Sequence, residues 1–230
     1  MTTVGRVKAI WRYPVKSMRG EALEEANVHW NGIRGDRRFA FVQPGLERSD
    51  FPWLTIRERP EMWGYVPRLL DPVKPDKSDA VVTTPGGSEL RVDDPRLARE
   101  LGEGARLIKQ NRGVFDTAPL SIMGSRTVEA MGGWDARRFR PNLVIEAGEP
   151  FAEEAWVGQV LTIGAMQMRV DRRDERCVMI DVNPDTGERD MQILKRLGRE
   201  RQARLGVYGT TVAPGAVRVG DLVRLPPVAR

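Results

Sequence analysis

Short apolar segments separated by tight turns fill the first forty residues, and this spacing constrains the fold more than any other feature. Three such segments, at 5–15, 22–30 and 36–43, have the composition of β-strands. The sequence Asn-Gly-Ile-Arg-Gly at 31–35 joins the last two and contains residues that tight turns favour. Helical periodicity is weak throughout this region. Strands this short and this closely spaced predict a β-barrel or a β-sandwich.

The pattern continues along the chain with more strands and a few short helices. Residues 80–92 alternate around Pro-Gly-Gly, which predicts a hairpin. Residues 93–102 predict a short helix with Asp94 as its N-cap, Pro95 in its first turn and Gly102 at its end. The fold class predicted from these signals is mainly β with short helices.

The second half of the chain alternates between β-rich stretches and two further helices. One helix is expected to begin where Ser125 or Thr127 can cap it. Residues 160–182 are β-rich, and 208–225 predict two closing strands around a Pro-Gly turn. Residues 191–205 form the clearest amphipathic helix, with basic side chains opposite an apolar stripe.

Composition is that of an ordinary globular protein of 230 residues, long enough to bury one large core or two small ones. Hydrophobic residues make up 40% and charged residues 30% of the chain. No segment approaches the roughly 20 apolar residues that a membrane-spanning helix needs. The first residues also lack the apolar run of about 7–15 residues that marks a secretory signal. We therefore expect a cytoplasmic protein with no membrane partner.

The net charge of +5, from 37 Lys and Arg against 32 Asp and Glu, raises the question of a nucleic-acid partner. The basic residues are scattered along the chain, with acidic residues among them, and form no Lys/Arg block. This distribution favours a small anionic ligand, or simple solubility, over nucleic acid. We therefore expect no nucleic-acid partner.

The single cysteine, Cys177, lies at the end of a β-rich stretch and before a turn. Arg172, Arg173 and Arg176 precede it, and nearby cations lower the pKa of a thiol and favour the thiolate, the form that attacks electrophiles and binds metals. The alternative is a buried cysteine that acts as a small hydrophobic residue beside the apolar residues 178–180. Position in the sequence leaves both interpretations open.

Other familiar catalytic arrangements are missing. The only histidine, His29, has no local companion suited to zinc or to a catalytic triad, so we expect a structural role for it. No Gly-rich loop matches a phosphate-binding or dinucleotide-binding fingerprint. One cysteine forms neither an internal disulfide nor an iron–sulfur cluster, which needs about four, so an electron-transfer partner would be a separate protein. Candidates for proton delivery are Asp181, Asp185 or a water.

Several cations and hydrogen-bonding side chains lie beside predicted turns. Arginine suits bidentate recognition of phosphate, lysine supplies a point charge, and serine and asparagine add oriented hydrogen bonds. Taken singly, each cation is most simply a solvated surface charge. Brought together by a barrel, the set would form a pocket for a phosphorylated small molecule. Its members are Lys16 and Ser17 in YPVKS, Arg37 in GDRRF, Arg57 in LTIRERP, and Arg140 with Asn142 in RFRPN.

These motifs also occur in a recognisable order. The N-terminal half contains, in order, YPVKS, GIRGDR and TIRERP. The C-terminal half contains, in order, RFRPNLVIE, FAEEAWVGQVLTIG, RCVMIDVNPDTGE and YGTTVAPGAVRVGDLVRL. In this order the chain resembles the MOSC family, named for the C-terminal domain of molybdenum cofactor sulfurase. Within that family it is similar to the mitochondrial amidoxime-reducing component and its bacterial relatives. The resemblance implies a MOSC β-barrel domain at 111–230 and a smaller, β-barrel-like N-terminal domain at 1–110, some of whose strands could pack with the larger domain.

The resemblance further implies a molybdopterin cofactor, with Cys177 as the molybdenum ligand. The activity it implies is the reduction of an N- or S-oxygenated small molecule, with electrons from a separate donor protein. The family is also associated with pyridoxal phosphate. Two other interpretations keep the fold: a carrier that holds a persulfide on Cys177, and a binding protein that has lost catalysis. The residues implied in cofactor binding are Lys16, Ser17, Arg37, Arg57, Arg140, Asn142 and Arg176.

Overall fold

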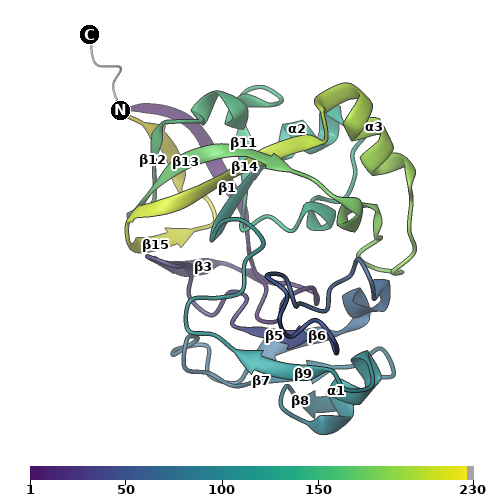
Figure 1. The fold of residues 1–230 in the computed structure, drawn as a ribbon. Helices are drawn as coiled ribbons and strands as arrows, with labels where there is room; N and C mark the ends of the chain where they lie inside the picture. Colours follow the sequence, from purple (N-terminus) through teal and green to yellow (C-terminus); the bar gives the residue numbers. More distant parts are fainter. Residues whose placement is uncertain (227–230) are drawn as a thin grey trace.

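A computed structural model of the chain, which describes residues 1–226, is built mostly of β-strands (Figure 1). Its α-helices within those residues are three and short: α1 (Pro95–Leu101), α2 (Ser125–Ala130) and α3 (Gln192–Arg201). The prediction of a mainly β fold with short helices is therefore confirmed. None of the helices in the described part of the chain is long and apolar enough to cross a membrane.

Seven strands close into a barrel, in the order β11-β10-β14-β13-β12-β16-β1 and back to β11. Among the described strands of the barrel, the one parallel pair is β10 with β11, and the connection between them contains α2 because parallel neighbours need a crossover. A short strand, β2 (Glu21–Leu23), extends the sheet beside β1. The barrel strands are β1 (Thr2–Arg12), β10 (Leu120–Gly124), β11 (Leu143–Ala147), β12 (Val160–Ile163), β13 (Met166–Glu175), β14 (Arg204–Ala213) and β16 (Leu222–Leu225).

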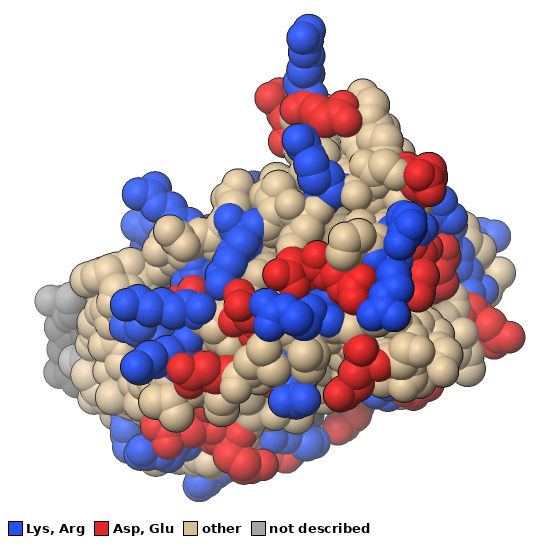
Figure 2. All heavy atoms as spheres, turned by 90° about the horizontal axis from the view of Figure 1, so that it is seen from below, with Lys and Arg blue, Asp and Glu red and all other residues tan. Residues whose placement is uncertain are grey.

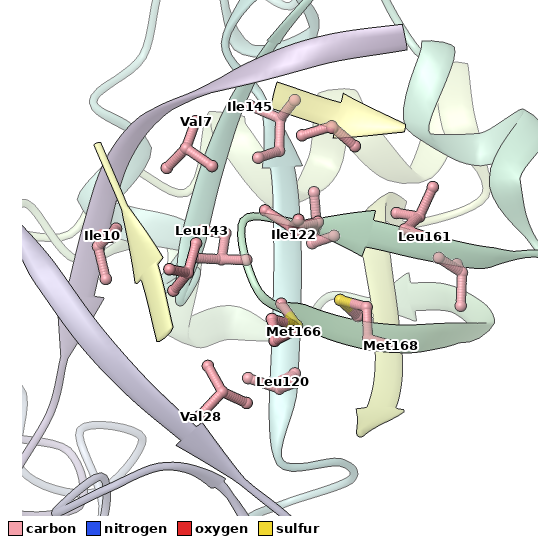
Figure 3. Close-up of a cluster of buried hydrophobic side chains, with 14 of the residues drawn as sticks. Val7, Ile10, Val28, Leu120, Ile122, Leu143, Ile145, Leu161, Met166 and Met168 are labelled. Atoms are coloured by element: carbon pink, nitrogen blue, oxygen red, sulfur yellow. The ribbon is translucent and has the colours of Figure 1, made fainter. Parts of the chain in front are cut away.

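Apolar side chains on the inward faces of these strands fill the barrel (Figure 3). On β13 the alternate residues Met166, Met168 and Val170 are fully buried, and on β11 the same spacing buries Leu143 and Ile145. Burying a side chain of this size stabilises the fold by about 1.5–3 kcal/mol. The packed interior therefore holds the end of β13, which leads directly to Cys177, in a defined position.

Smaller sheets pack around a second core in the lower half of Figure 1. β5 (Phe39–Val42) pairs with β9 (Arg106–Lys109), and the hairpin predicted at 80–92 is present. The N-cap prediction for α1 is also confirmed, because the Asp94 side chain accepts a hydrogen bond from the Arg96 backbone N–H. The remaining elements here are β6 (Val66–Leu69), β7 (Ala80–Thr83), β8 (Glu89–Arg91) and the 3-10 helix η1 (Pro60–Gly64).

A three-stranded sheet and a helical cluster flank the barrel. β3 (Glu25–His29) lies between β4 (Gly32–Ile33) and β15 (Gly215–Arg218). Helices α2 and α3 share a third apolar core with two 3-10 helices, η2 (Ala136–Phe139) and η4 (Val178–Asp181). A further 3-10 helix, η3 (Ala152–Trp156), contacts β10 and β14. The C-terminal segment 208–225, for which two strands were predicted, contains parts of three: β14, β15 and β16. Of these, β14 and β16 belong to the barrel and β15 pairs with β3.

Two predictions about helix ends were wrong. Helix α2 has no side-chain cap, because Thr127 Oγ1 donates to Glu153 Oε2 at 2.8 Å and Ser125 Oγ has no partner. Helix α3 ends before the predicted boundary at residue 205. Gln202 and Ala203 adopt left-handed backbone conformations, and β14 begins directly after them.

Candidate functional site

All eight site residues predicted from the sequence line one cavity, although they come from five separate segments of the chain. The segments meet where the barrel adjoins the smaller sheets, and all eight residues lie in turns or loops outside the strands and helices. Loops held by a rigid scaffold commonly carry binding groups. The eight residues are Lys16, Ser17, Arg37, Arg57, Arg140, Asn142, Arg176 and Cys177.

Three of these residues adopt a left-handed backbone conformation, which is uncommon for residues other than glycine. The φ angles are 66° at Ser17, 50° at Arg37 and 51° at Arg140. Such conformations cost on the order of 1 kcal/mol each and persist where the surroundings hold them. The backbone is therefore bent locally to turn these three side chains toward the cavity.

Arg140 is a deeply buried cation of the cavity, with an exposed fraction of 7%. Its guanidinium lies 4.2 Å from the centroid of the Tyr13 ring and 5.0 Å from that of Trp63, both in cation–π contact. Nη1 donates to the Met18 carbonyl at 2.7 Å, while Nη2 has no hydrogen-bond partner. Burial, followed by repulsion from Arg37, lowers the pKa of Arg140 to about 10. This side chain is therefore a buried cation with spare hydrogen-bonding capacity.

Asp36 holds this part of the cavity together, although it was not among the site residues predicted from the sequence. Its side chain is fully buried and pairs with Arg37. Oδ1 accepts a hydrogen bond from the Tyr13 backbone N–H at 2.7 Å, and Oδ2 accepts one from Asn142 Nδ2 at 3.1 Å. Asp36 therefore fixes the positions of Arg37 and Asn142.

Asp116 lies between two of the predicted cations. Oδ1 pairs with Lys16 Nζ, and Oδ2 lies 3.1 Å from Arg57 Nη2. Although burial acts to raise it, the pKa of Asp116 is lowered overall by the charges of Lys16 and Arg57. Burial lowers the pKa of Lys16, and Asp116 opposes that effect. This carboxylate, which the sequence analysis missed, is thus held in its charged form.

Cys177 lies between the end of β13 and η4, where it is half-buried. The cation at its sulfur is Arg57, whose Nη2 donates to Sγ at 3.4 Å. Of the three arginines that precede Cys177 in sequence, Arg176 lines the same cavity, and an effect of these arginines on the thiol stays a prediction. Arg176 directs Nε to the Leu205 carbonyl and Nη1 to the Phe139 carbonyl, each at 2.8 Å. The cation hydrogen-bonded to the sulfur therefore comes from a distant segment of the chain.

Both carboxylates suggested for proton delivery lie outside the cavity lining. Asp181 is buried and accepts a hydrogen bond from the Leu194 backbone N–H at 2.8 Å, near the start of α3. Asp185 is largely exposed and pairs with Arg137 at 2.7 Å. Neither residue is placed to deliver a proton beside Cys177.

The cavity carries an excess of positive charge. Its lining contains six cations and three carboxylates, which leaves a surplus of three positive charges. Among the buried polar atoms of the lining, Ser17 Oγ and Arg140 Nη2 have no hydrogen-bond partner within residues 1–226, and a ligand could satisfy both. Surplus cations and free donors together suit an anion such as phosphate. The cations are Lys16, Arg37, Arg57, Arg138, Arg140 and Arg176, and the carboxylates are Asp116, Asp174 and Glu175.

Comparisons with known families match two domain types to this chain. The family model for the MOSC domain matches residues 120–224, and that for the MOSC N-terminal beta barrel domain matches residues 4–117. Together the two matches cover nearly the whole sequence.

Similar proteins include amidoxime-reducing components and molybdenum cofactor sulfurases. Mitochondrial amidoxime-reducing component 1 of Mus musculus is 27% identical over 290 residues, covering 96% of this chain and 82% of that protein. Its Homo sapiens counterpart is 24% identical, with 96% and 83% covered. Molybdenum cofactor sulfurase of Danio rerio is 45% identical over 74 residues, covering 31% of this chain and 9% of that protein.

Among solved structures, the YuaD protein of Bacillus subtilis has a similar fold. The TM-score is 0.50 at 13% sequence identity, with 96% of this chain and 94% of that chain covered. At this level of identity the likeness extends to the fold alone.

Proposed function

This chain belongs to the MOSC family, and from that premise we propose that it is an oxidoreductase that binds a molybdenum cofactor and reduces N- or S-oxygenated small molecules. Relatives named for amidoxime reduction align with 96% of the chain. The observation that carries the proposal is the cavity itself, where one cysteine thiol lies among cations that exceed the carboxylates in number.

The cavity fits the anionic part of such a cofactor. Ser17 Oγ and Arg140 Nη2 are buried without partners, and an unsatisfied buried polar group costs about 1–3 kcal/mol. Phosphate oxygens bound beside them would remove that cost. Lys16 and Arg37 lie in the same lining and would add two charges. Asn142, whose amide N–H groups donate to the Trp11 carbonyl and to Asp36, would shape the wall of the site beside them. The other four residues would hold the cofactor by its phosphate.

Cys177 fits the role of a metal ligand within a cofactor. Among residues 1–226, no three His, Cys, Asp or Glu side chains are grouped so that they could hold a metal ion. One thiolate would therefore bind a metal only where a cofactor brings the other ligands, and a soft thiolate suits a molybdenum–sulfur centre. When bound, this cofactor would supply the two-electron chemistry that removes oxygen from the substrate.

Arg57, Asp116 and Arg176 position the thiol and the cations of the cavity. Arg57 donates to Cys177 Sγ and stabilises the thiolate, while Asp116 restrains Arg57 and Lys16 in the lining. Arg176, tied to two backbone carbonyls, connects the cysteine segment to β14. The chain thus binds and orients, and the cofactor performs the redox step.

The partners proposed are a small-molecule substrate and a separate electron-donor protein, since a single cysteine forms no iron–sulfur cluster. Figure 2 shows Lys and Arg side chains interleaved with Asp and Glu over one whole face, which does not favour nucleic acid. A cytoplasmic location and the association with pyridoxal phosphate stay predictions.

Reduction of benzamidoxime to benzamidine tests the proposal. The protein would be expressed in a host that makes the cofactor and assayed with dithionite-reduced viologen, so that no natural electron donor is needed. We expect turnover in wild type and none in Cys177→Ser. Asp171→Asn, whose side chain pairs with Arg169 outside the cavity, is the matched control. Turnover in Cys177→Ser equal to wild type would overturn the role of the thiolate.

A persulfide carrier is the second candidate, and two observations favour it. A segment of molybdenum cofactor sulfurase is 45% identical to part of this chain, and the half-buried Cys177 thiol has a cation beside it. A carrier would hold sulfur on Cys177 and retain no metal. Trapping a persulfide on metal-free, as-isolated protein by alkylation and mass spectrometry would support this function over the first.

A further inference from the structure

Asp174 is a buried carboxylate on a strand whose other buried side chains are apolar. It lies near the end of β13, among the buried residues of that strand, and is 1% exposed. It also lines the cavity that contains Cys177. Burying a carboxylate is costly unless it is well paired, so a fold that keeps one here calls for an explanation.

The pairing of Asp174 is incomplete. Arg176 Nη2 lies 2.7 Å from Oδ2, but the contact lacks hydrogen-bond geometry. By strict geometry neither oxygen of Asp174 has a hydrogen-bond partner among the described residues, and the Tyr208 hydroxyl approaches it as a weak hydrogen-bond donor. The other nitrogens of Arg176 are directed to backbone carbonyls. A bidentate pair, which would hold the carboxylate charged, is therefore not formed.

Tyr208 connects Asp174 to a second cavity. It lies on β14, which pairs with β13. The two side chains are close enough that each changes the pKa of the other. Tyr208 lines both the inner cavity and an adjoining outer one, whose lining includes the exposed Arg172 and Glu175. A neutral tyrosine hydroxyl can accept a proton on one side while it donates on the other.

We propose that Asp174 and Tyr208 form a proton relay, which carries protons from the outer cavity to the reacting oxygen beside Cys177. This inference rests on the proposed function. Removing oxygen from an N–O or S–O group consumes two electrons and two protons, and yields the reduced compound and one water. The donor protein supplies the electrons. Asp174 gives a proton to the departing oxygen and is reprotonated from the outer cavity through Tyr208.

The charges around Asp174 allow it to hold a proton near neutral pH. Burial raises its pKa to about 6, and the cations Arg176, Arg37 and Arg172 together with Tyr208 only partly oppose this. Burial and the charge of Asp174 raise the pKa of Tyr208, so the phenol stays neutral. A group with a pKa near the working pH is the most effective general acid.

The other carboxylates of the cavity are poorly suited to this role. Asp116 is held in its charged form by Lys16 and Arg57. Glu175 is largely exposed and pairs with Arg204 at 3.0 Å. Among the described residues, Asp174 is therefore the carboxyl group of the lining best placed to carry a proton.

Infrared difference spectroscopy on cofactor-free protein tests the proton-holding group without any activity. The carbonyl band of a protonated carboxylic acid would be followed from about pH 4 to about pH 8 in wild type, Asp174→Asn and Asp171→Asn. We expect a band that titrates near pH 6 in wild type and Asp171→Asn and is missing from Asp174→Asn. The same band in all three proteins, or none in wild type, would overturn the proposal.

The pH dependence of benzamidoxime reduction tests the relay in the loaded enzyme. With molybdenum content equal to wild type, Asp174→Asn should turn over on the order of 100-fold more slowly and lose the fall in rate above pH 6. Tyr208→Phe should slow turnover while the infrared band remains. An unchanged pH profile in Asp174→Asn would overturn the relay. Loss of molybdenum from Asp174→Asn would also overturn it, because the residue would then act in holding the cofactor. A titrating band in a protein that reduces no substrate would contradict the proposed function alone.

Discussion

Replacing Asp174 by asparagine should change how the stability of the protein depends on pH. Burial raises the pKa of Asp174 from 3.8 to about 6. The folded chain therefore binds this proton more tightly than the unfolded chain does. The resulting stabilisation is fully present below about pH 4 and is lost as the pH rises through 6. Because the pKa of Asp174 differs by about 2 between the folded and the unfolded chain, the folded protein loses about 3 kcal/mol of stability by pH 7.

Asparagine has nearly the same shape as a protonated carboxyl but does not ionise. The variant should therefore not lose this stability as the pH rises. The free energy of unfolding would be measured by urea denaturation of cofactor-free wild type and Asp174→Asn at several pH values. Subtracting one from the other cancels the contribution of every other titrating group. The stability of the variant relative to wild type should rise by about 2 to 3 kcal/mol between pH 4 and pH 7.

Asp171→Asn is the matched control, because Asp171 lies on the same strand but pairs with Arg169 outside the cavity. Its stability relative to wild type should not depend on pH in the same way. A difference between Asp174→Asn and wild type that stays constant across this range would refute the reasoning. It would mean that Asp174 titrates alike in the folded and unfolded chain.

Three further substitutions have defined outcomes. Arg140→Ala should lower cofactor retention at least tenfold by removing a buried cation with a free donor, and full molybdenum content in this variant would count against the phosphate pocket. Arg57→Ala should slow alkylation of Cys177 by iodoacetamide several-fold, since Sγ loses its hydrogen bond, whereas Arg172→Ala should not. Ser17→Gly should raise the free energy of unfolding by about 1 kcal/mol, because it relieves a positive φ angle, yet weaken cofactor binding; a urea midpoint that falls would contradict this.

Local patterns were sufficient to predict the fold class and to select residues that meet in one cavity. Strand spacing and turn residues depend on near neighbours in the chain, and these predicted the hairpin at 80–92 and the helix capped by Asp94. Cations beside turns were a useful signal because turns lie at strand ends, and a closed barrel brings several strand ends together. Lys16 and Arg140, more than a hundred residues apart, meet in this way.

The parts that could not be predicted depend on tertiary packing. Asp36, Asp116 and Asp174 have no distinguishing sequence context, and their importance comes from burial beside cations brought in from other segments. The contact between Cys177 and Arg57 was not predicted either. The arginine hydrogen-bonded to the thiol is Arg57, which tertiary packing brings from a segment 120 residues away, rather than one of those adjacent in sequence.

The measurement that tests the central claim most directly is the molybdenum content of protein from a cofactor-competent host, compared between wild type and Cys177→Ser. The account predicts near-stoichiometric molybdenum in wild type and a large loss in the variant, with the fold unchanged by circular dichroism. Molybdenum that is absent from wild type, or equal in both proteins, would contradict it.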